Sequence, residues 1–126
     1  MSSRLIALIL PIALATAVPT AAQPAPLAVT IDVSSFRFGP RPLVLAAGRP
    51  VTLTFFNRSG SGHDFTAPAF FARSQILDGA ARGGEVELRP HEIRTIRLIP
   101  AAGTYKAHCS HFFHAAMGMT DVIIVR

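Results

Sequence analysis

The feature of this sequence that most constrains its fold is the regular alternation of apolar and polar residues in short segments. In residues 29–33 and 51–55 every second side chain is apolar. A two-residue period places alternate side chains on opposite faces of a strand, so each segment predicts a half-buried β-strand. Nine Gly and ten Pro residues interrupt the apolar segments. They leave almost no stretch with a sustained helical period.

The same pattern along the chain predicts seven or eight short strands in roughly 100 residues, which is typical of an all-β, antiparallel β-sandwich. One short helix is expected at about 68–77, with Phe70, Phe71 and Leu77 facing the core. The expected strands are 29–33, 43–45, 51–57, 63–67, 85–88, 92–99, 105–109 and 121–125.

The first 22 residues are typical of a secretory signal peptide. A positive charge at Arg4 precedes an apolar run at 5–18, and Thr20 and Ala22 occupy the positions where signal peptidase prefers small residues. The run is shorter than the about 20 residues that a membrane-spanning helix needs. We therefore expect export to the periplasm with cleavage after Ala22; retention as a membrane anchor is the alternative.

After cleavage, the sequence predicts a flexible lead-in at 23–26 and one domain at 27–126. Loss of Arg4 lowers the net charge from the +5 of the whole chain to +4. The basic residues are scattered, which attracts acidic partners or anionic surfaces only weakly. No basic and aromatic motif for nucleic acid is present. We expect a monomer without a nucleic-acid partner and without stable membrane insertion.

Cys109 is the single cysteine of the chain. Exported proteins meet an oxidising compartment, where cysteines normally pair as disulfides. Because Cys109 has no partner in its own chain, it must be buried and inert, bridge two molecules or bind a metal. The residues around it decide between these possibilities.

The segment from His108 to Met119 holds one thiol, three imidazoles and two thioethers. Cys109, His114 and Met119 follow one another at intervals of five residues, so a hairpin-like loop can turn all three toward one point. Thiolate and thioether sulfurs hold Cu(I), and imidazole accepts either oxidation state of copper. Two histidines and one cysteine with a weak axial methionine form a blue-copper arrangement, so one further histidine is needed.

His63 is the best candidate for that second histidine. It stands in Gly-Ser-Gly-His-Asp, after the loop that follows the strand at 51–57. Taken alone, His63 is more often an ordinary surface or core histidine. Beside a Cys–His–Met loop that lacks its fourth ligand, it becomes the expected partner. His91, next to Pro90 in a turn, is expected to be exposed and is a poor candidate.

With these residues, the sequence resembles the cupredoxins, the family of single-domain type 1 copper proteins that includes azurin, plastocyanin, pseudoazurin and rusticyanin. The resemblance lies in the strand at 51–56 followed by Gly62-His63-Asp64, and in the segment from Gly103 through Cys109-x4-His114-x4-Met119 to Val125. It implies a Greek-key sandwich, one copper ion and one-electron transfer. His63, Cys109 and His114 would bind copper, with Met119 as the weak axial ligand.

The resemblance also suggests roles for residues next to the ligands. Asp64 stands where relatives often carry Asn, and its carboxylate is expected to accept a backbone N–H beside Cys109 and to favour Cu(II). An ordinary surface carboxylate is the alternative. Phe112 and Phe113 flank His114 in a region where relatives present an apolar surface for electron exchange. They are expected to form a docking patch, with at least one of them packing into the core.

Several residues leave alternatives open. Met117 rivals Met119 as the axial ligand; Met119 is preferred because it lies nearer the last strand. Asp121 stands where relatives usually have Gly, so the end of the loop is not fixed by the pattern. His108 is expected on the face of its strand opposite to Cys109. His111 is expected to be an exposed loop residue, although it could replace a ligand or capture copper on entry.

The function expected from this reasoning is a periplasmic one-electron carrier. Its partner would be a cytochrome, an oxidase or a reductase. No nucleophile–base pair, paired carboxylates or phosphate loop is recognisable, so the chain is not expected to be an enzyme. The alternative is a copper-handling protein that buffers or delivers copper and works with a copper transporter. The surplus of His108, His111 and Met117 around the site favours that alternative.

Overall fold

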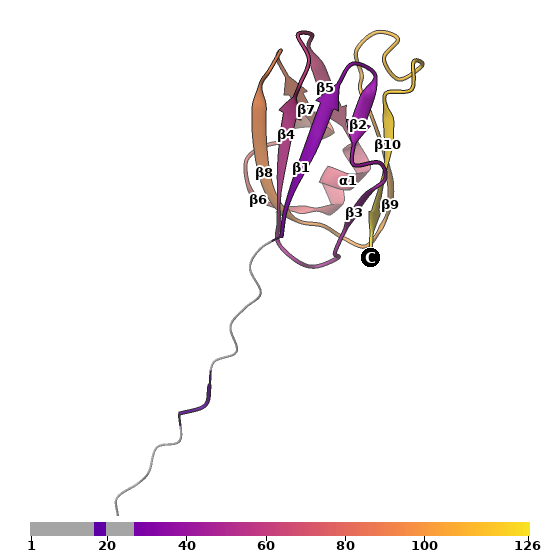
Figure 1. Ribbon diagram of the computed structural model, residues 1–126. Helices are drawn as coiled ribbons and strands as arrows, with labels where there is room; N and C mark the ends of the chain where they lie inside the picture. The colour runs from indigo at the N-terminus through magenta and orange to yellow at the C-terminus, as the bar shows by residue number, and fades with distance from the viewer. Residues whose placement is uncertain (1–16, 20–26) are drawn as a thin grey trace, which may run out of the picture.

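The computed structural model describes residues 17–19 and 27–126, and Figure 1 shows how their elements are arranged. The strands are β1 (Leu27–Ser34), β2 (Arg37–Gly39), β3 (Leu43–Leu45), β4 (Val51–Asn57), β5 (His63–Thr66), β6 (Gln75–Asp78), β7 (Glu85–Leu88), β8 (Ile93–Ile99), β9 (Gly103–His108) and β10 (Thr120–Val125). The helices are α1 (Pro68–Arg73) and the short 3-10 helix η1 (Arg82–Gly84). Apart from residues 17–19, the predicted signal peptide and lead-in lie outside the described residues. Within the described part, no helix has the length and apolar character needed to cross a membrane.

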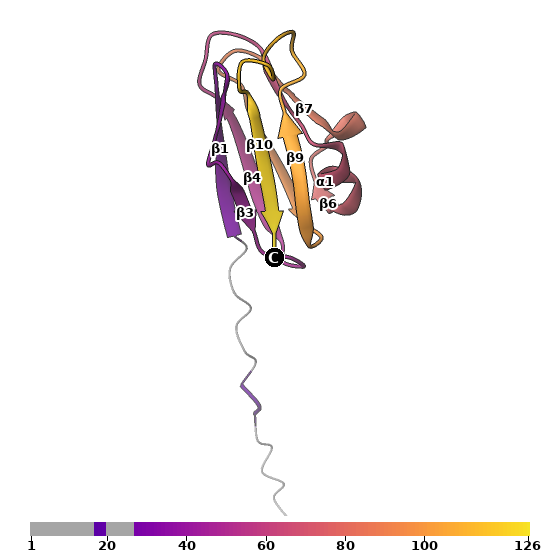
Figure 2. The same ribbon diagram turned by 90° about the vertical axis from the view of Figure 1, so that its right-hand side faces the viewer.

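The strands form two five-stranded sheets that face each other. One sheet has the order β2-β1-β4-β8-β6 and the other β3-β10-β9-β5-β7. The predicted sandwich is confirmed, but its pairing is not purely antiparallel, because β1 pairs with β4 and β3 with β10 in parallel. Both parallel pairs join strands that are not neighbours in sequence, and local alternation carries no information about such pairing. Figure 2 shows the layers after a quarter turn.

The core lies between the sheets and follows the two-residue period. In β4, Val51, Leu53 and Phe55 are buried, whereas the threonines between them are only partly covered. Phe65 of β5 lies at the centre, with its ring 5.2 Å from the rings of both Phe38 and Phe55, measured between centroids. Each fully buried Leu or Phe side chain contributes about 2 kcal/mol to the free energy of unfolding. This core supports both loops of the candidate site.

The predicted helix is shorter than expected. It ends at Arg73, because Ser74 adopts an extended conformation and its side-chain oxygen donates a hydrogen bond of 2.8 Å to the carbonyl of Phe70. Phe70 and Phe71 are buried as expected. Leu77, expected in the core, is instead 37% exposed. It belongs to β6, an edge strand whose four residues are all exposed.

Two connections at one end of the sandwich carry the predicted ligands. The β4–β5 connection (58–62) and the β9–β10 connection (109–119) lie close together at the end opposite the C-terminus (Figure 1). The first leads into His63, and the second contains Cys109, His114 and Met119. The β1–β2 turn, with Phe36, lies at the same end, since Phe36 contacts His114.

Candidate metal centre

His63 is positioned by a loop that Asn57 holds in place. The amide nitrogen of Asn57, at the end of β4, donates to the carbonyls of Ser61 at 2.7 Å and Arg89 at 2.9 Å. Its amide oxygen accepts the backbone N–H of Ser59 at 3.0 Å. Asn57 is fully buried, so these bonds also satisfy its own polar atoms. The loop therefore delivers His63 to the start of β5, where its side chain is buried.

The β9–β10 connection is closed by backbone hydrogen bonds around the other predicted ligands. The N–H of Cys109 donates to the carbonyl of Met119 at 3.0 Å, and the N–H of Met119 donates to the carbonyl of His114 at 3.0 Å. Gly118 has φ of 96°, a conformation that strongly favours glycine and lets the chain turn back into β10. Cys109 and Met119 are both buried at the base of this loop.

The donor atoms of His63, Cys109 and His114 converge on one point. The Nδ1 atoms of His63 and His114 are 3.2 Å apart, and the sulfur of Cys109 lies 3.3 Å from Nδ1 of His114 and 4.0 Å from Nδ1 of His63. Imidazole and thiolate bonds to first-row metals measure about 2.0–2.3 Å. Three such bonds in a plane separate the donor atoms by roughly 3.5–3.9 Å. The three residues therefore fit a trigonal metal ion.

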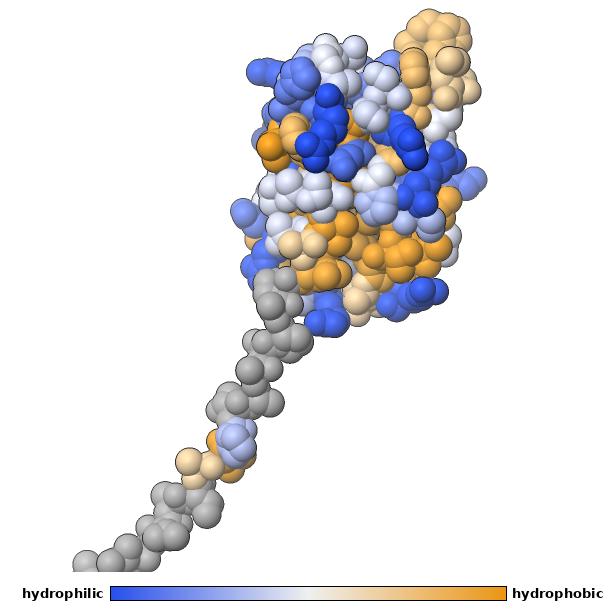
Figure 3. Space-filling view, viewed as in Figure 1, coloured by the Kyte–Doolittle hydropathy of each residue, from blue (hydrophilic) through white to orange (hydrophobic). Residues whose placement is uncertain are grey.

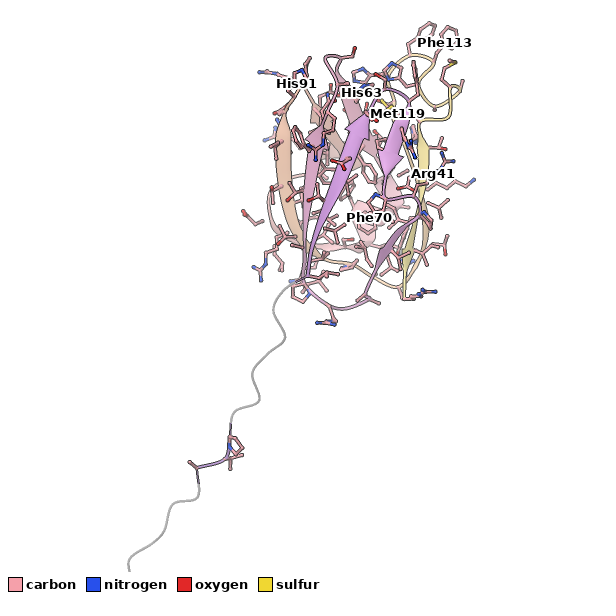
Figure 4. All side chains as sticks on the ribbon, in the orientation of Figure 1. Arg41, His63, Phe70, His91, Phe113 and Met119 are labelled. Carbon is pink, nitrogen blue, oxygen red and sulfur yellow. The ribbon has the colours of Figure 1, made fainter. Side chains whose placement is uncertain are left out.

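The two candidate methionines differ sharply in burial. Met119 is completely buried, whereas Met117 is 63% exposed on the loop. Figure 4 shows that Met119 and His63 both lie toward the loop end of the sandwich. A thioether must lie inside the site to act as an axial ligand, so burial favours Met119 over Met117.

Asp64 joins the two ligand loops. Its carboxylate accepts the backbone N–H of Ser110 at 2.9 Å and the hydroxyl of Ser110, and the hydroxyl of Thr66 donates to it at 2.7 Å. The backbone N–H of Asp64 points at the sulfur of Cys109 from 3.5 Å. The expected bond beside Cys109 is thus present, and Asp64 is fully buried rather than an ordinary surface carboxylate. Such bonds orient ligands and tune a metal.

Burial shifts the pKa values of two predicted ligands, and the two shifts act on metal binding in opposite directions. It lowers the pKa of His63, and the neighbouring His114 lowers it further, so the imidazole is neutral and can bind a metal. Burial also raises the pKa of the Cys109 thiol. A metal that binds the thiolate must therefore displace a proton, and its affinity falls as the pH falls.

His114 links the buried site to the surface. It is partly exposed, and the ring of Phe36 meets it edge-on at 5.2 Å between centroids. Phe112 and Phe113 are 83% and 66% exposed. The expectation that one of them packs into the core is therefore wrong. The loop turns away from the sandwich, and their rings contact each other instead, at 4.0 Å between centroids.

The remaining histidines occupy different surroundings. His91 is exposed in a turn, as predicted. His108 is partly buried at the end of β9, outside the group of donor atoms. His111, expected to be an exposed loop residue, is partly buried, with Nε2 at 3.1 Å from Glu87. Its ring stacks on His114 at 5.5 Å between centroids.

Asp121 is buried at the start of β10, with Oδ1 accepting the backbone N–H of Val122. Within the described part of the chain, its Oδ2 has no hydrogen-bond partner. Asp121 is therefore a regular residue of β10, paired with Ala107 of β9.

Sequence reasoning did not identify Asn57, Phe36 or Glu87 as neighbours of the site. Asn57 begins Asn-Arg-Ser-Gly, a composition typical of a turn stabilised by its first side chain, and that signal could have identified it. Phe36 and Glu87 reach the site only through the packing of separate strands. No local signal marks them.

Comparisons with known proteins show the fold. No family model and no curated protein matches the sequence. Among solved structures, a dithionite-reduced auracyanin of the photosynthetic bacterium Roseiflexus castenholzii aligns with a TM-score of 0.60 and 22% identity over 82% of this chain and 99% of its own. Auracyanin A, a "blue" copper protein of Chloroflexus aurantiacus, aligns with a TM-score of 0.55 and 21% identity over 79% of this chain and 99% of its own.

Larger copper proteins contain the same fold. A multicopper oxidase of Campylobacter jejuni, described as a metallo-oxidase, aligns with a TM-score of 0.61 and 15% identity. The match covers 84% of this chain but only 31% of the oxidase. Together these structures show that the chain has the cupredoxin fold of the blue copper proteins.

Proposed function

Because the chain has the cupredoxin fold and brings three donor atoms together at one end of it, we propose that it binds one copper ion and carries single electrons. His63, Cys109 and His114 would hold the ion through two imidazoles and a thiolate, and Met119 would add a weak thioether ligand. The observation that carries the proposal is the convergence of two Nδ1 atoms and one sulfur within 4.0 Å of one another. Two imidazoles and a thiolate with a weak thioether are the ligands of a blue-copper site.

The chain's own residues prepare the site for electron transfer by holding the ligands still. Copper, when bound, supplies the Cu(II)/Cu(I) couple. Asn57 fixes the loop before His63, and Asp64 ties that strand to Ser110, next to Cys109. Interiors that are packed and fully hydrogen-bonded resist rearrangement. Ligands held in this way keep similar positions in both oxidation states, so little reorganisation opposes electron transfer.

The exposed end of His114 is the proposed exit for the electron. Phe112, Phe113 and Met117 form an apolar docking patch on the loop around it, and all three are strongly exposed. Figure 3 shows this apolar tip projecting at one end of the molecule, next to hydrophilic side chains. An exposed apolar group of this kind is typical of a protein-binding surface. A redox protein is the proposed partner.

Copper binding and redox cycling together test the proposal. The purified protein is loaded with Cu(II), dialysed, and passed through several cycles of chemical reduction and air oxidation. We expect one copper per chain and an intense visible band that disappears and returns in each cycle without loss of metal. Loss of copper on reduction would contradict a carrier.

Copper buffering or delivery is the second candidate function, favoured by the exposed Met117 and by the position of His111 against His114. Replacing Phe113 with Asp should slow electron exchange with a redox partner and leave copper exchange with a chelator unchanged if the protein is a carrier. His111→Gln should slow copper exchange if the protein delivers copper. Slowed copper exchange with normal electron transfer in Phe113→Asp would contradict the carrier.

We further propose that the chain is exported and works in the periplasm. The charged start, apolar run and small residues of the first 22 positions support this. Mass spectrometry of the protein from a periplasmic extract should find Gln23 as the first residue. Recovery of the protein from the membrane fraction with its first 22 residues still attached would indicate a membrane anchor instead.

A further inference from the structure

A second group of metal-binding side chains lies beside the proposed copper site. Asp64 of β5, Glu87 of β7 and His111 of the β9–β10 connection place one donor atom each within 4.8 Å of the other two. Nε2 of His111 is 3.1 Å from Glu87 Oε1 and 3.7 Å from Asp64 Oδ2. This group shares no residue with His63, Cys109 and His114.

The separations fit a divalent ion. Nitrogen and carboxylate bonds to Zn²⁺ measure about 2.0–2.2 Å in a tetrahedral site, which separates donor atoms by roughly 3.3–3.6 Å. The separations of His111 Nε2 from Glu87 Oε1 and Asp64 Oδ2, 3.1 and 3.7 Å, lie on either side of that range. Shifts of a few tenths of an ångström would bring them into it.

Electrostatics favour a cation at this point. Asp64 and Glu87 stand directly opposite each other in the antiparallel pair β5–β7, where like charges are unfavourable. Among the described residues, His111 is the only basic group within 4 Å of either carboxylate. Arg82 and Arg94 line the hollow beside Glu85 and Glu87 without bonding Asp64 or Glu87.

Two of the three side chains are held in place. Asp64 is fully buried and fixed by its bonds to Ser110 and Thr66. The ring of His111 lies between His114, on which it stacks, and Gly62. A Cβ at position 62 would stand 3.3 Å from the ring, so glycine leaves the space that the ring occupies. Only Glu87, half-exposed, must adjust.

We propose that Asp64, Glu87 and His111 form a second metal site that takes one divalent cation of the Zn²⁺ type. One imidazole and two carboxylates suit borderline cations, and water would complete a tetrahedral set. The site goes beyond the proposed electron carrier and does not depend on it, because its ligands are separate from the copper ligands.

Calorimetric titration with Zn²⁺ tests the second site. Zn²⁺ is added to wild-type protein that already holds one copper ion, and the visible band is followed to check that the copper stays bound. We expect one further equivalent of Zn²⁺ to bind with the band unchanged. Glu87→Gln and His111→Gln should each weaken this binding by about tenfold or more, since even the loss of a residue that only orients a ligand has an effect of that size.

Two matched variants serve as controls. Glu85→Gln removes the same charge from the same strand, and His91→Gln removes a histidine outside the group; both should leave zinc affinity within about threefold. Absence of a further equivalent, displacement of copper, or an equal loss of affinity in Glu85→Gln and Glu87→Gln would overturn the proposal. If the wild type binds no copper, the proposed function fails. Zinc titration of Cys109→Ser, with and without Glu87→Gln, still shows whether the second site binds Zn²⁺.

Discussion

At the scale of single residues, the buried carboxylate of Asp64 has two effects on the site that can be separated. Asp64→Asn keeps an oxygen that can accept the N–H of Ser110 but removes a negative charge beside the metal. Because that charge favours Cu(II), we expect the coloured site to persist with a higher reduction potential, measured by voltammetry. A lower potential in this variant would contradict the account.

Asp64→Ala, by contrast, removes the bonds to Ser110 as well as the charge. We expect copper affinity to fall by about 10–100-fold, as is usual when a residue that orients ligands is lost. Comparison of the two variants separates the charge from the hydrogen bonds.

The axial position is a second residue-scale question. Met119→Leu should keep the visible band and raise the reduction potential, because a weak donor to Cu(II) is lost. Met117→Leu is the matched control, and since Met117 is exposed its potential should hardly change. Voltammetry of both variants decides the assignment, and a shift confined to Met117→Leu would move the axial ligand to Met117.

Asp121 tests the cost of a buried charge in the metal-free protein. Burial raises its pKa in the folded state, so ionisation destabilises that state. The cost is absent below the pKa of the unfolded chain, appears as the pH rises between the two pKa values, and is complete above the folded pKa. Asp121→Asn should therefore increase the free energy of unfolding at neutral pH, on the order of 1 kcal/mol.

Urea unfolding at several pH values measures this effect. The gain from Asp121→Asn should vanish at acid pH, where both states of the wild type are protonated. Asp78→Asn, at an exposed position, should change the free energy by no more than about 0.5 kcal/mol at any pH. A gain that does not depend on pH would refute the proposed cause.

The spacing of residues predicted the grouping of Cys109, His114 and Met119 well. It predicted the side chains that surround this group less well. The intervals from Cys109 to His114 and Met119 are local and can be seen in one loop. His63 required the chemical argument that a ligand was missing. The contact of His111 with Glu87 could not be predicted, because it depends on how β7 packs against the loop.

At the scale of elements, alternation predicted eight of the described strands, including the three-residue β3, and missed β2 and β6. β2 buries only one side chain, that of Phe38, and β6 buries none, so neither shows an alternating buried face in sequence. The helix was predicted to run too far, to about residue 77, because the apolar residues of β6 resembled a continuation of α1. Pairing between strands distant in sequence, including both parallel pairs, follows from the whole sandwich.

The junction of α1 and η1 offers an element-scale prediction. Gly84 has φ of 79°, and a Cβ there would stand 2.4 Å from Cα of Pro68, at the start of α1. Gly84→Ala should therefore lower the free energy of unfolding by about 3 kcal/mol or more, because backbone must move. Gly83→Ala, with φ of 63° and open space around it, should cost only about 1 kcal/mol.

Thermal or urea unfolding of both variants measures the difference. The visible band of the copper form should be the same in each, since the junction lies outside the ligand loops. Equal destabilisation of the two variants would show that left-handed backbone strain, rather than the contact with Pro68, controls this position.

At the scale of the whole molecule, the sandwich acts as a rigid frame that brings two distant parts of the chain to one end. His63 and His114 are 51 residues apart in sequence, yet their Nδ1 atoms are 3.2 Å apart. The sheets provide this convergence. We expect these converging donors to bind one copper ion in a blue-copper site.

The most direct test of that claim is an absorption titration of the metal-free protein with Cu(II). We expect an intense visible band, from thiolate-to-copper charge transfer, that saturates at one equivalent in the wild type and in His91→Ala. We expect no such band in Cys109→Ser and a disrupted one in His63→Ala and His114→Ala. A band that persists in Cys109→Ser, or a wild type that stays colourless with copper bound, would contradict that claim.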